Sequence, residues 1–381
     1  MRFQSFFLAG FECSCFRFPD GRQLDLLAST GHAEWADRDY AAMKPLGLRT
    51  AREGVRWHLV NPAPYSYDWS SLLPMLRAAR GEGIQVIWDL CHFGWPAWLD
   101  IWSSRFPEAF ARYAAAVARL IAQESELPAL YCPVNEMSYW SWAGGDMAHF
   151  GPCTVGRGAE LKRQLVRAFV QAADIIQDID PGAKFVAAEP MIAVHVGNPG
   201  DETGAAAAHA SQFEALDMIT GRVQAELGGD ERYLDILGVN YYPHNQWLHG
   251  GAQLAHDDPR YTPLNRLLQN QARRYGRPIL IAETGAEGAA RAPWLRYVAN
   301  QALLAQGAGV DVAGICLYPV TDYPGWEDDR YCATGLFSAP SDAGQRAIYA
   351  PLAVEMRVQA SRFGDGPAAL LGARVVDERE G

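Results

Sequence analysis

The sequence predicts an α/β protein, a single-domain (β/α)8 or TIM barrel, on three observations. Short apolar, β-rich segments alternate with longer amphipathic segments eight times between residues 6 and 363. Such alternation predicts parallel strands, because parallel neighbours are joined by long crossovers. Eight units in a row fit a closed barrel better than an open sheet. Finally, no glycine-rich phosphate loop follows the first strand, which disfavours a doubly wound nucleotide-binding fold.

The predicted elements follow one another in a regular order. Strands are expected within 6–11, 48–57, 84–93, 129–136, 183–190, 234–242, 278–285 and 312–320. The helices that follow them are expected within 36–47, 70–83, 105–124, 159–180, 211–227, 263–276, 293–309 and 347–363. Helix stop signals precede several of the strands, as at 46–48, 81–83 and 180–182.

No linker interrupts this rhythm, so residues 1–381 are expected to form one domain. The Ala-rich stretch 203–211 is predicted to be a surface loop or the start of a helix. The C-terminal tail from about residue 366 is predicted to fray, since it is polar at its end.

The composition is typical of a soluble globular protein with a large core, with 49% hydrophobic and 20% charged residues. The net charge of −11 and the lack of any Lys/Arg cluster argue against nucleic acid or an anionic membrane as the main partner. The apolar stretch near the N-terminus is too short for a signal peptide, and no run approaches the length that spans a bilayer. We therefore expect a cytoplasmic protein.

The cysteines support a reducing compartment. There are seven of them, an odd number, and four lie in apolar, strand-like segments. Cys13-Ser14-Cys15 is a C-x-C sequence, but nothing nearby completes a set of zinc ligands. No metal site is expected.

Candidate chemistry lies at the strand ends, because the active site of such a barrel forms at the carboxyl ends of its strands. The polar residues expected there are Arg52, Glu53, Asp89, His92, Asn135, Glu136, Glu189, Asn240, Tyr241, Tyr242, Glu283, Tyr318 and Asp322. A single Glu in such a place is more often a solvated loop acid or a helix-capping partner. Glu136 and Glu283 differ because they end the fourth and seventh strands, which face each other across the barrel mouth. Two carboxyls about 5–5.5 Å apart can hydrolyse a glycosidic bond with retention.

Six segments in this order resemble the retaining (β/α)8 glycoside hydrolases, most of all glycoside hydrolase family 1. They are LGLRTAREGVRW, WDLCHFGWP, PVNEM, LGVNYYP, LIAETG and GICLYPVTDYPGW. The resemblance covers about Phe7 to Trp326. It implies that Glu136 is the acid/base and Glu283 the nucleophile, and that Arg52 lies beside the nucleophile. It also implies that His92 and Trp326 contact the sugar.

The resemblance is incomplete at the positions that bind the outer part of the sugar. Gly325 stands where the family usually has a Glu, Tyr318 where it usually has a Trp, and Met137 where it usually has a small residue or Pro. The first strand runs into GFECSC without the usual Gln. The hydrolytic residues are therefore expected to be kept while the outer sugar contacts differ, so no glucose or galactose preference is carried over.

Physical roles follow for the two acids and their neighbours. Arg52 beside Glu283 would lower the pKa of that carboxyl, although Arg52 could instead pair with Glu53. Apolar and aromatic groups after Glu136 would raise its pKa and keep it protonated. Strand alternation places Asn240 and Tyr242 on one face of the sixth strand, where the Tyr242 hydroxyl could bond Glu283.

The remaining candidates are expected to contact the substrate, although for several of them a purely structural role is an alternative. Asn135 would bond a sugar hydroxyl near the reacting carbon or be a turn residue, and His92 would contact the sugar or be a satisfied core residue. Trp140 and Trp326 are expected to stack on a sugar face, although core packing is the commoner fate of a Trp. Finally, Glu189 and Asp322 are candidate substrate contacts, whereas Glu53 and Glu287 are expected to be structural.

These expectations amount to a retaining β-glycosidase that hydrolyses a small glycoside through a covalent glycosyl-enzyme. Two alternatives stay open: a transglycosidase that uses the same residues, and a sugar-binding protein that has lost catalysis. No cofactor is expected, and the sequence leaves the oligomeric state open.

Overall fold

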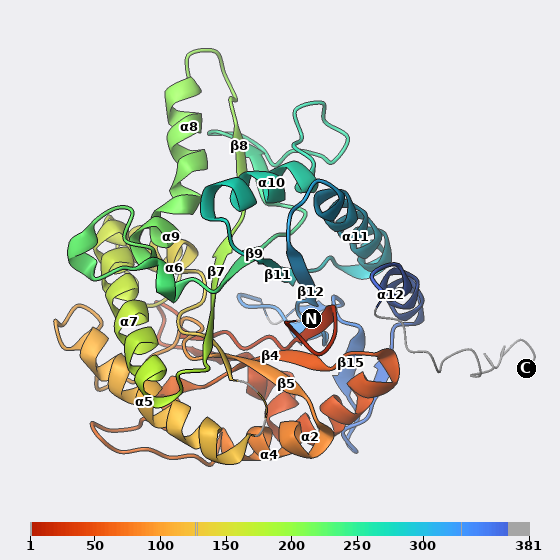
Figure 1. Ribbon diagram of the computed structural model, residues 1–381. Coiled ribbons are helices and arrows are strands. Elements are labelled where there is room, and N and C mark those ends of the chain that lie inside the picture. The colour runs from red at the N-terminus through yellow and green to blue at the C-terminus, as the bar shows by residue number, and fades with distance from the viewer. Residues whose placement is uncertain (1, 126, 128, 329, 365–381) are drawn as a thin grey trace, which may run out of the picture.

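A closed barrel of eight parallel strands forms the centre of the molecule (Figure 1). The computed structural model describes residues 2–125, 127, 129–328 and 330–364. The barrel strands are β1 (Phe7–Gly10), β4 (Thr50–Gly54), β5 (Gln85–Asp89), β6 (Leu130–Cys132), β7 (Lys184–Pro190), β9 (Ile236–Asn240), β11 (Ile279–Thr284) and β12 (Val312–Leu317). β12 pairs with β1 and closes the ring. The predicted (β/α)8 barrel is confirmed.

Helices surround the barrel (Figure 1). The longer ones are α2 (His32–Met43), α4 (Leu73–Glu82), α5 (Phe106–Glu124), α7 (Gly158–Ile179), α10 (Leu264–Tyr275), α11 (Arg291–Gly307) and α12 (Ala350–Arg362). Short helices are α1 (Leu26–Ser29), α3 (Trp57–Val60), α6 (Met137–Trp140), α8 (Glu202–Ala210) and α9 (Glu214–Ile219), with a π-helical stretch at Ser141–Asp146. None of the described helices is long and apolar enough to cross a bilayer. The predicted fraying of the tail concerns residues outside the described ranges.

Small two-stranded sheets decorate the loops. They pair β2 (Cys15–Arg17) with β3 (Gln23–Asp25), β8 (Ala193–His195) with β10 (Gln246–Leu248), β13 (Tyr323–Pro324) with β14 (Tyr331–Cys332), and β15 (Phe337–Pro340) with β16 (Arg346–Ile348). The Ala-rich stretch is a helix, α8, which stands beside β8 and projects from the barrel (Figure 1).

The fifth predicted helix, 211–227, is broken in the structure. Its helical part, α9, ends at Ile219, and the segment continues only as a short 3-10 turn at Ala225–Leu227. Gly221 adopts a positive φ of 72°, through which a right-handed helix cannot continue. The amphipathic pattern therefore overstated the length of this helix.

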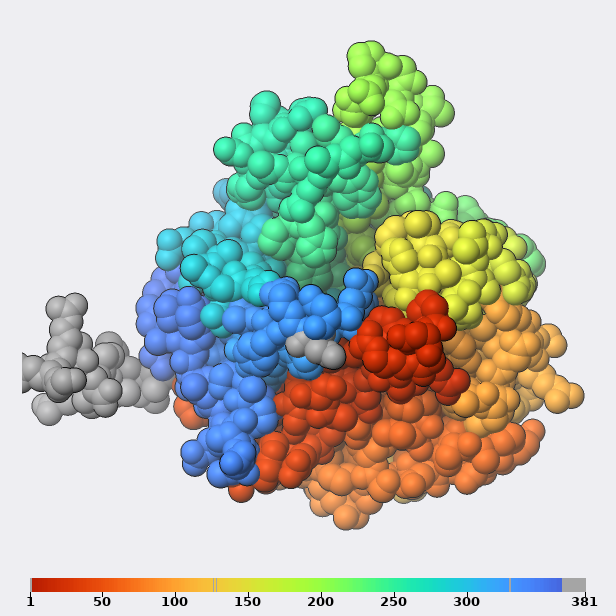
Figure 2. Space-filling view, turned by 180° about the vertical axis from the view of Figure 1, so that it is seen from behind, coloured from red at the N-terminus to blue at the C-terminus, as the bar shows by residue number. Residues whose placement is uncertain are grey.

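The side chains of each barrel strand pack in two apolar layers, one inside the barrel and one between the barrel and the helices. The barrel interior contains residues that alternate along the strands, among them Leu8, Ile87, Leu130, Val186 and Leu280. The other face of each strand packs against the helices. The loops that follow the strands lie on the face shown in Figure 2, where segments from the red, yellow, green and blue parts of the chain meet. The strand-end residues named above are carried toward this face.

Candidate active site

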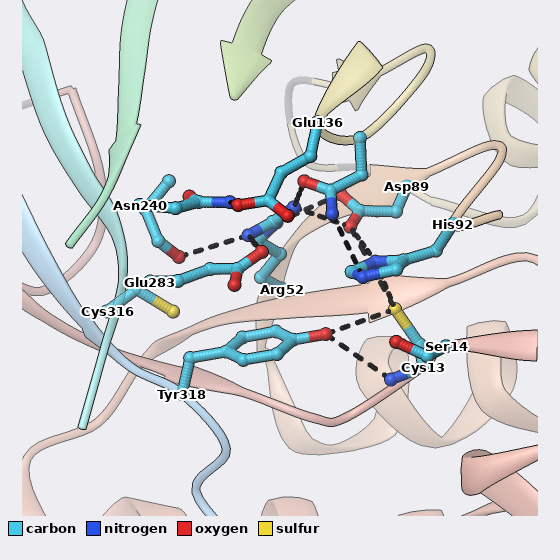
Figure 3. Close-up of polar contacts among 12 residues, drawn as sticks. Cys13, Ser14, Arg52, Asp89, His92, Glu136, Asn240, Glu283, Cys316 and Tyr318 are labelled. Atoms are coloured by element: carbon cyan, nitrogen blue, oxygen red, sulfur yellow. Dashed lines mark hydrogen bonds and ion pairs between the residues drawn. The ribbon is translucent and has the colours of Figure 1, made fainter. Parts of the chain in front are cut away.

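Arg52 is the centre of the candidate site, fully buried on the inner face of β4 (Figure 3). Its Nε and Nη2 donate to the two oxygens of Asp89 at 3.0 and 2.7 Å, and its Nη1 donates to Glu283 Oε1 at 2.7 Å. Burial alone would lower the pKa of Arg52, but the charges of Asp89 and Glu283 outweigh it and raise the pKa well above its usual value. Arg52 is thus a fixed cation that neutralises two acids.

Glu53, the other possible partner of Arg52, points the opposite way. Its Oε1 accepts hydrogen bonds from Tyr40 and His32, both at 2.8 Å, in the layer between barrel and helices. Alternation along β4 explains the separation, because successive side chains leave a strand on opposite faces. The structural role expected for Glu53 fits this position.

Glu283 reaches the pocket through an irregularity in β11. Ala282 belongs to the barrel interior, so regular alternation would turn Glu283 outward. However, the register shifts between Ile281 and Glu283 against β9, where two residues of β11 oppose one. This β-bulge brings Glu283 inward as well. The Tyr242 hydroxyl donates to Glu283 Oε2 at 2.8 Å, which is the hydrogen bond expected from the sequence.

Glu136 follows β6 in a left-handed backbone conformation, with φ 44° and ψ 57°. This conformation costs a non-glycine residue about 1–2 kcal/mol, and the hydrogen bond from Glu136 N–H to the Ala188 carbonyl, 2.9 Å, helps to hold it. The side chain accepts a hydrogen bond from Asn240 Nδ2 at 2.8 Å. Burial, followed by the charge of Glu283, raises the pKa of Glu136 well above its usual value. Both causes favour the protonated form of Glu136.

Asn135 and His92 form the floor beneath the two acids. Asn135 accepts from Arg52 Nη2 at 2.6 Å and donates to His92 Nε2 at 2.9 Å. His92 Nδ1 lies 3.0 Å from Asp89 Oδ2, so this nitrogen carries the proton and Nε2 accepts. The Asn135 side chain is buried with 0% exposure, which favours a role in positioning Arg52 and His92 over sugar contact.

One group of possible metal ligands occurs among the described residues, formed by Cys13, Asp89 and His92. The Cys13 sulfur lies 3.1 Å from His92 Nδ1 and 3.9 Å from Asp89. Burial and the charge of Asp89 raise the pKa of Cys13 well above its usual value, which keeps the thiol protonated. Because Arg52 already binds both Asp89 oxygens, a cation here would meet a guanidinium at close range. We interpret the group as a hydrogen-bonded cluster.

The surroundings of Trp140 favour core packing over the predicted stacking on a sugar face. Its side chain is fully buried, and its indole N–H donates to the Gly151 carbonyl at 2.8 Å. It packs near Phe93 and Trp95 and so supports the loop after Glu136. By contrast, Trp326 is half-buried and lies edge-on to Phe16, at 5.1 Å between ring centroids, within an aromatic wall.

Glu189 and Asp322 are both engaged by the protein itself. Glu189 lies on the outer face of β7 and accepts a hydrogen bond from the Ser138 N–H at 3.1 Å. Asp322 accepts from the Gly335 N–H at 2.7 Å and lies 3.6 Å from Arg291. These contacts favour supporting roles over direct contact with a substrate.

Glu12 is a further pocket residue that the sequence prediction did not select. It is 5% exposed and follows Leu8 and Gly10 on the inner face of the first strand. Its Oε1 accepts a hydrogen bond from the Ser14 N–H at 2.9 Å. The alternation of Leu8, Gly10 and Glu12 could have predicted that Glu12 faces inward. However, the predicted strand is short, so the sequence GFECSC is expected to be a loop.

Comparison with known proteins agrees with the fold. No family model and no curated protein matches the chain. Among solved structures, a family 1 β-glucosidase from Thermotoga maritima superposes with a TM-score of 0.77, covering 96% of this chain and 98% of the other at 14% identity. The fold is that of the family 1 β-glucosidases.

Other solved structures support the same fold. A β-glucosidase from Thermotoga maritima in complex with castanospermine gives a TM-score of 0.75 at 14% identity over 95% of this chain and 98% of the other. A hyperthermophilic β-glucosidase mutant gives 0.74 at 16% identity over 93% and 99%. Identities this low establish the family 1-like architecture, and they leave the activity to be argued from the site.

Proposed function

We propose that this protein is a retaining β-glycosidase that hydrolyses a small glycoside. The observation that carries the proposal is the convergence of Glu136 and Glu283, which lie near each other after β6 and on β11 in different electrostatic surroundings (Figure 3). Glu283 pairs with the guanidinium of Arg52 and accepts the Tyr242 hydroxyl, whereas burial and the nearby Glu283 raise the pKa of Glu136 and favour its protonated form. Two carboxyls in different states are what double displacement at an anomeric carbon requires.

In the first step, Glu283 attacks the anomeric carbon while Glu136 gives its proton to the departing glycosidic oxygen. The bond to the aglycone breaks, and an ester forms between the sugar and Glu283. Esterification removes the charge of Glu283, which is one of the causes that raise the pKa of Glu136. Glu136 can then ionise and accept a proton from water. That water attacks the anomeric carbon and releases Glu283 with the original stereochemistry.

The test is a screen of aryl β-glycosides with the wild type and Glu283→Ala. We expect the variant to lose at least about 10³-fold in kcat and to regain turnover with azide as an external nucleophile, giving an α-glycosyl azide. Glu231→Ala is the control, because Glu231 precedes β9 at the opposite end of the barrel and pairs with surface arginines. Turnover that survives Glu283→Ala would overturn the proposal.

The same assay separates the alternatives. Addition of an alcohol acceptor gives mainly alkyl glycoside from a transglycosidase and mainly free sugar from a hydrolase. A sugar-binding protein without catalysis would bind sugars and turn over none of the aryl glycosides.

We also propose a reducing, cytoplasmic location. All seven cysteines are unpaired, and most of them are buried. Titration of thiols in the protein purified from its natural host under non-reducing conditions would count seven free thiols if this is right, and fewer if disulfides form.

A further inference from the structure

Glu12 is a buried carboxyl in the pocket mouth that the proposed chemistry does not use. Its place follows from strand alternation. Leu8 belongs to the barrel interior, whereas Ala9 and Phe11 pack in the outer layer. Gly10 faces inward against the Tyr318 ring, and the Phe11 N–H still pairs with the Arg52 carbonyl at 3.0 Å, so strand geometry continues past β1. The next inward side chain, one step nearer the mouth, is Glu12.

The neighbours of Glu12 are pocket residues from several strands. Electrostatic interactions join it to His92, Glu283, Tyr242, Tyr318 and Tyr323. It therefore shares the pocket with the nucleophile. β1 lies nearly across the barrel from β6, which carries Glu136. Because Glu136 must meet the leaving group, a sugar bound between the two acids extends its far side toward Glu12.

The protein leaves Glu12 incompletely satisfied. Within the described ranges Ser14 is the only residue that hydrogen-bonds to its carboxyl, and no Lys or Arg there forms an ion pair with it. Burial raises the pKa of Glu12, while His92 and Ser14 act the other way. A buried acid with spare bonding capacity costs stability and is expected where a ligand completes its hydrogen bonds.

We propose that Glu12 binds a hydroxyl group on the side of the sugar ring remote from the anomeric carbon, and thereby selects sugars that carry a hydroxyl there. The inference rests on the proposed function for the orientation of the sugar. The recognition of an outer hydroxyl is thus assigned to the end of the first strand.

The decisive experiment combines Glu12 variants with deoxy substrates. Aryl glycosides of the sugar preferred by the wild type are prepared with the C3, C4 or C6 hydroxyl removed in turn. We expect Glu12→Ala to lose roughly 10- to 100-fold in kcat/KM on the parent substrate and Glu12→Gln to lose less. One deoxy substrate should be poor for the wild type and no worse than the parent for Glu12→Ala. Equal sensitivity of both enzymes at every position would overturn the inference while leaving the proposed function intact.

Binding gives a readout that does not need turnover. Castanospermine, the ligand of one structural neighbour, serves as the calorimetric probe. We expect Glu12→Ala to weaken its binding about tenfold or more, and Glu34→Gln, an exposed acid on α2, to leave it unchanged. If the wild type binds castanospermine but hydrolyses no aryl glycoside, the catalytic proposal fails. The binding difference between the wild type and Glu12→Ala then still decides the inference about Glu12. Unaltered binding to Glu12→Ala, or neither binding nor turnover by the wild type, contradicts the inference.

A purely structural role for Glu12 makes an opposite prediction for stability. Because the pKa of Glu12 is raised in the folded state, its ionisation costs stability as the pH rises through that pKa. Glu12→Gln should therefore keep or raise the Tm at pH 8. A clear fall in Tm for Glu12→Gln, with unchanged kinetics, would mean that Glu12 only holds the turn at Ser14.

Discussion

At the scale of the residue, the site depends on side chains whose surroundings give equal chemical groups different states. Asp89 and Glu283 share the guanidinium of Arg52, whereas the one hydrogen-bond donor to the Glu136 carboxyl among the described residues is the neutral amide of Asn240. The two main acids, Arg52 and Tyr242 could be selected from the sequence because each lies at or near the end of a strand, although alternation alone would have turned Glu283 to the wrong face. The sequence could not reveal that Trp140 is buried, since exposure depends on how the loop after Glu136 folds back.

Glu189 is expected to position Glu136. It accepts the Ser138 N–H at the start of α6, directly after Glu136, and burial raises its pKa to about 7. Its charge is one of the causes that raise the pKa of Glu136. Glu189→Gln keeps an acceptor and removes the charge, so the alkaline limb of the kcat/KM profile should move to lower pH.

Glu189→Ala also removes the acceptor for Ser138. We expect kcat to fall roughly 10- to 100-fold with little change in KM, because the acid/base loses its alignment. Kinetics with an aryl glycoside measure both variants across pH 5 to 9. A rise in KM as the main effect, with an unmoved pH profile, would instead support substrate contact by Glu189.

At the scale of the element, the repeat of strands and helices was predictable, but the local departures from regularity were not. The alternation of apolar and amphipathic segments located all eight barrel strands, because each must bury one face or both. The bulge in β11 and the early end of α9 depend on pairing and backbone angles that a hydrophobic pattern does not record. The bulge matters most for function, since it decides which face Glu283 occupies.

β1 provides a test of packing inside the barrel. A Cβ at Gly10 would lie 2.2 Å from Tyr318 Cδ2 and 2.9 Å from Cys316 Sγ. We expect Gly10→Ala to displace the Tyr318 ring and to reduce the free energy of unfolding by about 1–3 kcal/mol. Gly81→Ala, in α4 with open space around its Cβ, should instead stabilise by roughly 0.5–1 kcal/mol. Urea unfolding measures both, and equal effects of the two changes would refute the crowding at β1.

At the scale of the whole molecule, a buried charge network joins α2 and β4, which come early in the chain, to β16, which comes late. Arg346 on β16 binds Asp39 on α2 at 2.6 Å, and Asp39 binds His32 at 2.7 Å. His32 continues the network to Glu53 on β4. In addition, Phe6 stacks on Phe363 at 3.9 Å. The barrel is thus closed by side chains outside it as well as by the pairing of β1 with β12.

Because of this network, the free energy of unfolding is expected to fall as the pH rises above neutrality. Burial alone would lower the pKa of His32, but Glu53 and Asp39 raise it from 6.5 to about 9. A group whose pKa is raised on folding contributes stability that is complete below its unfolded pKa and lost as the pH rises through its folded pKa. We expect on the order of 3 kcal/mol of unfolding free energy to disappear between about pH 6.5 and 9.

Urea unfolding at pH 6, 8 and 10 tests this expectation, with His32→Gln as the comparison because it cannot titrate. The difference in unfolding free energy between wild type and variant should shrink as the pH rises. A constant difference over this range would show that His32 is not charged in the folded protein.

The bulge in β11 also has a lesson for protein engineering. If the two acids were grafted onto an idealised barrel with regular strands, the residue that corresponds to Glu283 would face the helices. The designed protein would then lack the proposed activity. The extra residue at Ala282 would have to be transplanted with the acid. By the same reasoning, deletion of a single residue there should abolish the proposed activity while sparing every side chain assigned to it.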